Sequence, residues 1–110
     1  MAGQAALRVG VAGLGTVGAG VVRLFRANRR GIEQRAGRPI EIVAVSARQR
    51  QRDRGIDVSE LRWHDDPLSL AEAGDIDVVA ELIGGAEGPA RALVETALAR
   101  GKPVVTANKA

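Results

Sequence analysis

Residues 13–18 read GLGTVG, and this hexapeptide decides how the rest of the chain is interpreted. Glycines at its first, third and sixth positions have the spacing of a loop that binds the pyrophosphate of a dinucleotide. Gly13 would permit the tight turn, Gly15 would let the backbone approach the phosphates, and Gly18 would let the next helix pack closely on the preceding strand. The amides of the first helical turn would face the phosphates at a positively polarised helix N-terminus. The predicted cofactor-binding residues of this loop are Gly13, Leu14, Gly15, Thr16, Val17 and Gly18.

A glycine triplet alone is a weak signal, but its surroundings support it. Residues 7–12 predict a buried strand, and residues 40–47 predict a second strand rich in β-branched side chains. Between them lies a predicted helix that ends near Gly31. One apolar stripe marks this helix as amphipathic: Val17, Val21, Leu24 and Phe25. Strand, loop, helix and strand together predict a right-handed βαβ unit.

The rest of the chain continues this alternation. Residues 48–63 show no sustained period and are predicted to be loop, whereas Asp66 before Pro67 predicts the cap of a short helix. Further strands are predicted at residues 76–83 and 102–107, with a helix between them. The expected fold is α/β, a Rossmann-type doubly wound parallel sheet, incomplete, with about four strands in the order 3-2-1-4.

Composition limits the classes of function. The 110 residues form one small domain, residues 1–110, without room for a second. There is no cysteine, which excludes thiolate metal sites and favours a reducing, cytoplasmic setting. No stretch approaches the roughly 20 apolar residues of a membrane span. Phe25 and Trp63 are the only aromatic residues, so a stacking platform for nucleic acid is not expected despite the net charge of +3.

The end of the second predicted strand bears on the choice of dinucleotide. An acidic residue there would hold the free ribose hydroxyls of NAD, whereas arginine accommodates the 2′-phosphate of NADP. This strand ends in Ser46 and Arg48, and more arginines follow. We therefore expect NADP as cofactor, with NAD possible. The other interpretation is that these arginines form only a solvated loop.

Further candidates follow the third and fourth predicted strands, because ligands bind at the carboxyl ends of parallel strands. Ile83 and Gly84 could line the cofactor crevice. Residues of the TANKA segment could reach the nicotinamide ribose or the substrate: Thr106, Asn108 and Lys109. Lys109 could equally be an ordinary exposed lysine.

Other polar residues give weaker signals. Glu81 would need partners if buried, and such residues are more often edge or capping residues than acid catalysts. His64 has no set of metal ligands at suitable spacing and is interpreted as a surface residue. We predict no catalytic residue and no metal ligand within this chain.

Several segments, in order, resemble the N-terminal cofactor domain of homoserine dehydrogenase: VGVAGLGTVGAGVV, IVAVSAR, ELIGG, EGPA and ALARGKPVVTANKA. The resemblance covers nearly the whole chain, and ELIGG with VVTANKA is more specific than the glycine triplet. It implies an oxidoreductase that interconverts L-homoserine and L-aspartate 4-semialdehyde with NAD(P)H, on the route to threonine, methionine and isoleucine. It also implies that Arg48 lies near the adenosine ribose and that Lys109 lies by the nicotinamide and the substrate.

Members of this family are several times longer than this chain. The resemblance therefore implies an N-terminal fragment, inactive by itself, whose substrate and dimerisation domain is absent and whose full-length form is a homo-oligomer. Three alternatives remain. The first is a stand-alone NADP-binding module without catalysis, and the second is another oxidoreductase with the same kind of N-terminal Rossmann domain. The third is a basic interaction protein that uses the arginines between Arg23 and Arg54.

Overall fold

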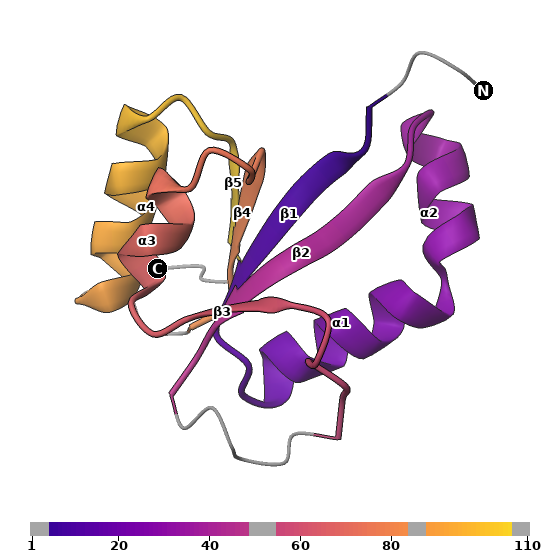
Figure 1. The fold of residues 1–110 in the computed structure, drawn as a ribbon, viewed down its shortest axis with the longest axis horizontal. Coiled ribbons are helices and arrows are strands. Elements are labelled where there is room, and N and C mark those ends of the chain that lie inside the picture. Colours follow the sequence, from indigo (N-terminus) through magenta and orange to yellow (C-terminus); the bar gives the residue numbers. More distant parts are fainter. Residues whose placement is uncertain (1–4, 49–54, 84–87, 107–110) are drawn as a thin grey trace.

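The computed structural model describes residues 5–48, 55–83 and 88–106 and shows a parallel five-stranded sheet with helices on both faces (Figure 1). The strand order is β3-β2-β1-β4-β5, and each neighbouring pair is parallel. The strands are β1 (Leu7–Ala12), β2 (Ile40–Ser46), β3 (Arg62–His64), β4 (Val78–Glu81) and β5 (Val104–Thr106). The α/β, doubly wound fold class predicted from the sequence is confirmed.

The described residues form four helices, which flank the sheet (Figure 1). They are α1 (Thr16–Ala27), α2 (Arg29–Ala36), α3 (Pro67–Glu72) and α4 (Pro89–Ala99). The α3 and α4 helices pack over one face around a core that includes Leu70, Val79 and Leu93. On the other face, α1 buries Val22 against Val11 of β1 and its neighbours. The chain thus changes faces between its first half and its second half, as a doubly wound sheet requires.

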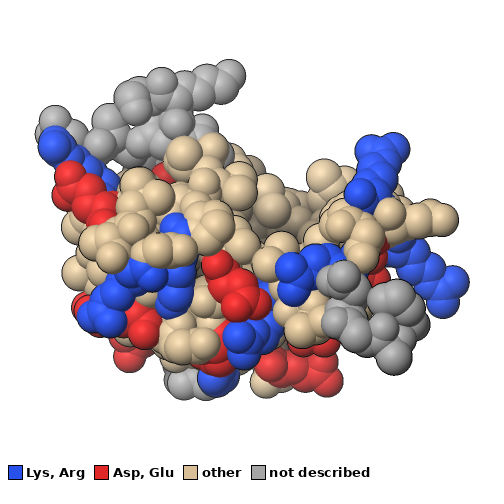
Figure 2. Space-filling model, turned by 90° about the horizontal axis from the view of Figure 1, so that it is seen from above, with Lys and Arg blue, Asp and Glu red and all other residues tan. Residues whose placement is uncertain are grey.

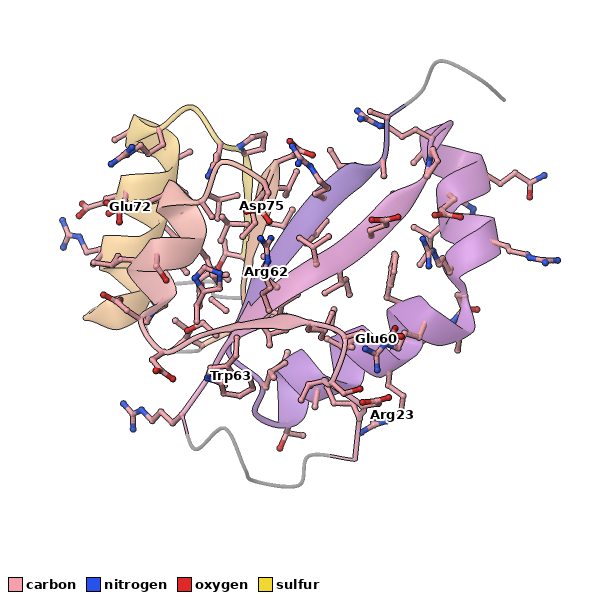
Figure 3. The ribbon with its side chains drawn as sticks, viewed as in Figure 1. Arg23, Glu60, Arg62, Trp63, Glu72 and Asp75 are labelled. Atoms are coloured by element: carbon pink, nitrogen blue, oxygen red, sulfur yellow. The ribbon has the colours of Figure 1, made fainter. Side chains whose placement is uncertain are left out.

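The sheet contains the order 3-2-1-4 with Arg62–His64 as its third strand, and β5 lies at the edge. The strand predicted at residues 76–83, which was the third in the predicted order, is instead β4 and pairs with β1, so its predicted place beside the second strand was wrong. The prediction of loop for residues 48–63 was wrong at its end, since Arg62 and Trp63 belong to β3. Three residues without an apolar run give little local signal, and β3 exists because it pairs with Ala44–Ser46 of β2. An ion pair between Arg62 and Asp75 links β3 to the segment before β4 (Figure 3).

The face of α1 that contacts the sheet differs from the predicted stripe. Val17, Val21 and Leu24 are 55%, 40% and 64% exposed, so the inference that they mark the packed face was wrong. The buried residues are instead Gly18, Ala19 and Val22. Small residues allow the helix axis to approach the sheet closely, and a pattern based on large apolar side chains cannot detect such a face.

The end of α1 was also predicted wrongly. The helix stops at Ala27, where the side-chain amide of Asn28 donates a 3.0 Å hydrogen bond to the carbonyl of Leu24. Gly31 lies inside α2, and the left-handed residue that ends α2 is Gly37, with φ of 75°. The short helix after Asp66 is confirmed, because the Asp66 side chain accepts a 2.9 Å hydrogen bond from the Leu68 amide.

Gly18 provides a direct test of this packing. A Cβ atom at Gly18 would overlap the carbonyl oxygen of Gly13, so Gly18→Ala should lower the free energy of unfolding by about 3 kcal/mol or more. Gly20→Ala is the matched control, because no described atom lies within 4 Å of a Cβ there. It should stabilise α1 by about 0.5–1 kcal/mol. Denaturant unfolding of both variants measures the difference, and equal stability of the two would contradict the packing.

Candidate functional site

The glycine loop is held between the carboxyl ends of β2 and β4. Gly13 has a φ of 98°, and its amide donates a 2.7 Å hydrogen bond to the carbonyl of Ser46 at the end of β2. On the other side, a Cβ at Gly13 would lie 2.8 Å from the backbone of Leu82 and Ile83. Leu14 is buried in the core beside Val22, so only its backbone could contact a ligand. The loop is therefore fixed by backbone contacts on both sides.

The N-terminus of α1 is open. Gly15 is the N-cap residue, with φ of −72° and ψ of −159°, and no described side chain caps the helix. The first turn carries no acidic residue. No described atom lies within 4 Å of a Cβ built at Gly15, and Thr16 and Val17 are exposed. This space and these uncapped amides fit an anionic phosphate group without rearrangement.

Arg48 lies two residues beyond the point where β2 holds the loop. Ser46 is buried and its carbonyl accepts the hydrogen bond from Gly13, whereas Arg48 is exposed. Arg48 is thus two residues from the backbone that bonds to Gly13, at the carboxyl end of the sheet. The arginines that follow it, at positions 50, 52 and 54, lie outside the described residues.

The ends of β4 and β5 form the other side of the candidate site. Ile83 is 37% exposed, and Thr106 is exposed at the end of β5. Glu81 is 1% exposed and accepts hydrogen bonds from both, 2.7 Å from the Ile83 amide and 2.6 Å from the Thr106 hydroxyl. The expectation of an edge residue was wrong because β4 lies between β1 and β5, but its bond to Ile83 is of the capping kind. Gly84, Asn108 and Lys109 lie outside the described residues.

His64 is less exposed than the sequence suggested. It lies on β3, and its Nδ1 is 2.6 Å from the hydroxyl of Ser69. That hydroxyl donates to the carbonyl of Asp66, so the imidazole Nδ1 is the donor to Ser69. Burial, and secondarily the charge of Arg62, lower the pKa of His64. Within the described residues, no group of three or more His, Cys, Asp or Glu side chains could hold a metal ion.

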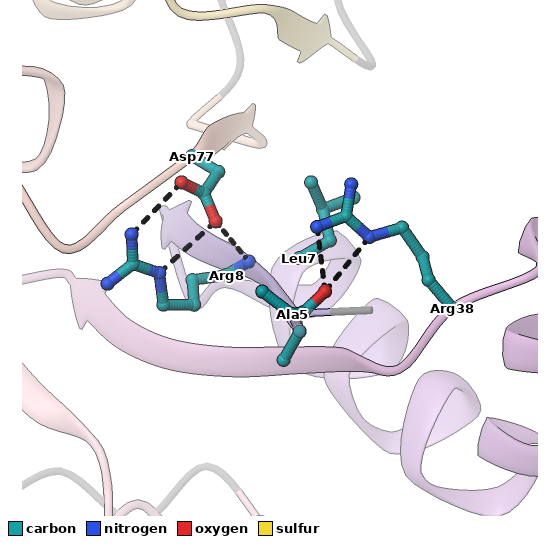
Figure 4. Close-up of a pocket in the computed structure, with 6 residues that line it drawn as sticks. Ala5, Leu7, Arg8, Arg38 and Asp77 are labelled. Carbon is teal, nitrogen blue, oxygen red and sulfur yellow. Dashed lines mark hydrogen bonds and ion pairs between the residues drawn. The ribbon is translucent and has the colours of Figure 1, made fainter. Parts of the chain in front are cut away.

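A hollow of about 580 Å³ lies at the opposite, amino-terminal end of the sheet (Figure 4). Arg8 forms an ion pair with Asp77 there, at 3.1 Å, and Arg38 donates to the carbonyl of Ala5. These charged groups already have partners within the protein, and the hollow is far along β1 from the glycine loop. On the face seen in Figure 2, acidic and basic side chains of the described residues are interspersed. This arrangement does not favour the basic interaction protein.

A glycine loop between strand and helix, open above Gly15, defines a dinucleotide-binding domain of the Rossmann type. Residues 13–110 match the family model described as "Homoserine dehydrogenase, NAD binding domain". The chain belongs to the homoserine dehydrogenase family and represents its nicotinamide dinucleotide-binding domain.

Individual relatives agree with this assignment. The chain is 42% identical over 104 residues to homoserine dehydrogenase of Methylobacillus glycogenes, covering 94% of this chain and 25% of the relative. It is 38% identical to the homoserine dehydrogenase of Bacillus subtilis, and the match covers 94% of this chain and 24% of that relative.

Solved structures show the same relation. The homoserine dehydrogenase of Thiobacillus denitrificans superposes with a TM-score of 0.86 at 43% identity, covering 97% of this chain and 24% of that one. The homoserine dehydrogenase from S. aureus superposes with a TM-score of 0.84 at 32% identity, covering 97% of this chain and 27% of that one. The chain thus spans about a quarter of the length of these relatives. No helix among the described residues is long and apolar enough to cross a membrane.

The space above Gly15 can be tested by filling it. Gly15→Ala adds a methyl group that meets no described protein atom, at a φ that alanine adopts readily. We expect unchanged thermal stability but at least about tenfold weaker dinucleotide binding, measured by calorimetric titration. Gly20→Ala, which also adds a methyl group in open space within the same helix, should leave binding unchanged. Wild-type affinity in the Gly15 variant would show that no ligand approaches this backbone.

The lowered pKa of His64 predicts a pH-dependent stability. The unfolded chain takes up a proton near the ordinary histidine pKa of about 6.5, whereas the folded chain does so only at lower pH. The free energy of unfolding should therefore fall as the pH decreases from about 7 to about 5. His64→Asn keeps a donor near Ser69 without a titrating group and should flatten this slope. Urea unfolding at several pH values measures it, and an equal slope in both proteins would contradict the assignment.

Proposed function

We propose that this chain is the cofactor-binding part of an NADP-preferring homoserine dehydrogenase, an oxidoreductase that interconverts L-homoserine and L-aspartate 4-semialdehyde. The observation that carries the proposal is the open, uncapped N-terminus of α1 beneath a glycine loop in a member of this family. The nicotinamide supplies the hydride chemistry when bound, while this chain binds and orients it. The whole enzyme acts in the cytoplasm as a homo-oligomer on the route to threonine, methionine and isoleucine.

The proposed roles follow the carboxyl ends of the strands. Residues 13–18 hold the pyrophosphate through backbone amides, and Arg48 pairs with the 2′-phosphate of the adenosine ribose. Ile83 and Gly84 line the crevice between the two halves of the sheet. Three further residues lie toward the nicotinamide and the substrate: Thr106, Asn108 and Lys109. This arrangement is supported by the positions of Arg48, Ile83 and Thr106 at one end of the sheet.

Cofactor preference can be measured on the chain itself. NADPH should bind more tightly than NADH in calorimetric titrations, and Arg48→Asp should weaken NADPH binding about tenfold or more without weakening NADH binding. The loss arises because a carboxylate beside the 2′-phosphate replaces attraction by repulsion, and added salt should reduce it. Arg30→Asp provides a control with the same charge change on α2, away from the loop (Figure 1).

The outcomes separate the parts of the proposal. Equal affinity of the wild-type chain for NADPH and NADH would contradict the NADP preference. An unchanged preference in the Arg48 variant would show that Arg48 does not contact the 2′-phosphate. Failure of the wild-type chain to bind either dinucleotide, while it unfolds cooperatively, would contradict the binding function.

A further inference from the structure

Glu81 is a carboxylate in the interior of the sheet. It ends β4, which pairs with β1 on one side and β5 on the other, and 1% of it is exposed. Burial of a carboxylate is costly unless its oxygens are hydrogen-bonded, and an apolar residue of similar size is often equally or more stabilising at such a position. A carboxylate at this place therefore calls for an explanation other than core stability.

The two oxygens of Glu81 have different partners. Oε2 accepts the Ile83 amide at 2.7 Å, and Oε1 accepts the Thr106 hydroxyl at 2.6 Å from the neighbouring strand. Glu81 and Thr106 are paired in register across β4 and β5. No cationic side chain among the described residues forms an ion pair with Glu81, so two neutral donors carry its interactions.

These bonds connect the two sides of the candidate site. The bond to Ile83 fixes the turn after β4, and this turn is the backbone against which Gly13 lies, since a Cβ at Gly13 would be 2.8 Å from the Ile83 amide nitrogen. The bond to Thr106 fixes the end of β5. One side chain thus joins the backbone that lies against the glycine loop to the end of β5.

We infer that Glu81 is a positioning residue for the cofactor: it holds the ends of β4 and β5 in the register that lets one dinucleotide contact both the glycine loop and the nicotinamide side of the crevice. The inference deepens the proposed function and rests on it. A bound dinucleotide spans both sides, whereas its adenosine half requires only the loop and the end of β2. Displacement of β5 relative to the loop therefore weakens binding of the whole cofactor selectively.

The test compares NADPH with 2′,5′-ADP, which carries the phosphorylated adenosine half but no nicotinamide. Glu81→Leu removes both hydrogen bonds, and we expect NADPH affinity to fall about tenfold or more while 2′,5′-ADP affinity changes less than about twofold. A purely structural role would weaken both ligands together, in proportion to the loss of folded protein.

Two further variants test whether the bond to Thr106 or the charge of Glu81 is needed. Glu81→Asp keeps the charge and can still accept the amide two residues on, but it is too short to reach Thr106, so it should show the same selective loss of NADPH affinity. It also carries the test if the Leu variant does not unfold cooperatively. Glu81→Gln can accept from Ile83 and donate to the Thr106 oxygen, so NADPH affinity should remain within about threefold of the wild type. Glu95→Gln on α4, in an exposed i,i+4 pair with Arg91, is the control for loss of a charge.

The result that overturns the inference is distinct from failure of the proposed function. If the wild-type chain binds NADPH and both the Leu and Asp variants bind it equally well, Glu81 does not position the cofactor. If these variants lose affinity for NADPH and for 2′,5′-ADP by the same factor, the inference is also overturned. If the wild-type chain binds neither NADPH nor 2′,5′-ADP measurably, the proposed function itself fails.

Discussion

The close approach of Gly18 to Gly13 is the contact on which the rest of the structure depends. With no side chain at either position, α1 begins directly over the turn that leaves β1, and Gly18 in its first turn lies against the Gly13 carbonyl. Val22 then reaches the core, and the side chains of Val17, Val21 and Leu24 turn outward. The same contact leaves Gly15 at the helix N-terminus with open space above it. Packing and the phosphate-binding geometry therefore have one common cause.

The position of this contact within the sheet explains where a ligand can lie. The chain leaves β1 toward one face through α1 and leaves β4 toward the other face through α4 (Figure 1). Loops that depart in opposite directions leave a crevice between them at the carboxyl ends of the strands. Gly13 follows β1 and Ile83 follows β4, and their backbones lie close together at this point. The expected position of a ligand thus follows from strand order and does not need a special loop.

Strong local patterns were predictable from the sequence. The glycine loop, the β-branched run of β2 and the Asp66 cap each depend on neighbouring residues alone, and each was located correctly. The short strand β3 was missed because its existence depends on pairing with β2. The buried face of α1 was assigned wrongly because close approach favours small residues there.

For the candidate site, the sequence indicated which residues gather at the carboxyl end but not how they are held. Ile83 and Thr106 were chosen by their places after strands, and this reasoning says nothing about a shared partner. The link through Glu81 depends on the register of β4 with β5, two segments 25 residues apart. A carboxylate in an apolar strand was the available signal, and it predicted either an edge or a capping residue, of which only the capping role fits the bond to Ile83.

The two ends of the sheet are held together by different forces. At the amino-terminal end, partly exposed ion pairs join neighbouring segments: Arg8 with Asp77 and Arg62 with Asp75. Such solvent-exposed pairs contribute little to stability and weaken as salt screens them. At the carboxyl end, the Gly13 amide bonds to the Ser46 carbonyl and the Leu82 amide bonds to the Ala12 carbonyl, interactions that salt affects little.

This difference matters because a phosphate ligand brings its own charge and its own salt dependence. A loop held by exposed ion pairs would compete with the ligand for the same cations, and its shape would change with ionic strength. A loop held by backbone amides and by a carboxylate turned inward keeps its shape, and the helix N-terminus carries no acidic side chain that would repel phosphate. Separation of the charged supports from the anion-binding end therefore lets ionic strength act on ligand attraction without altering the geometry of the site.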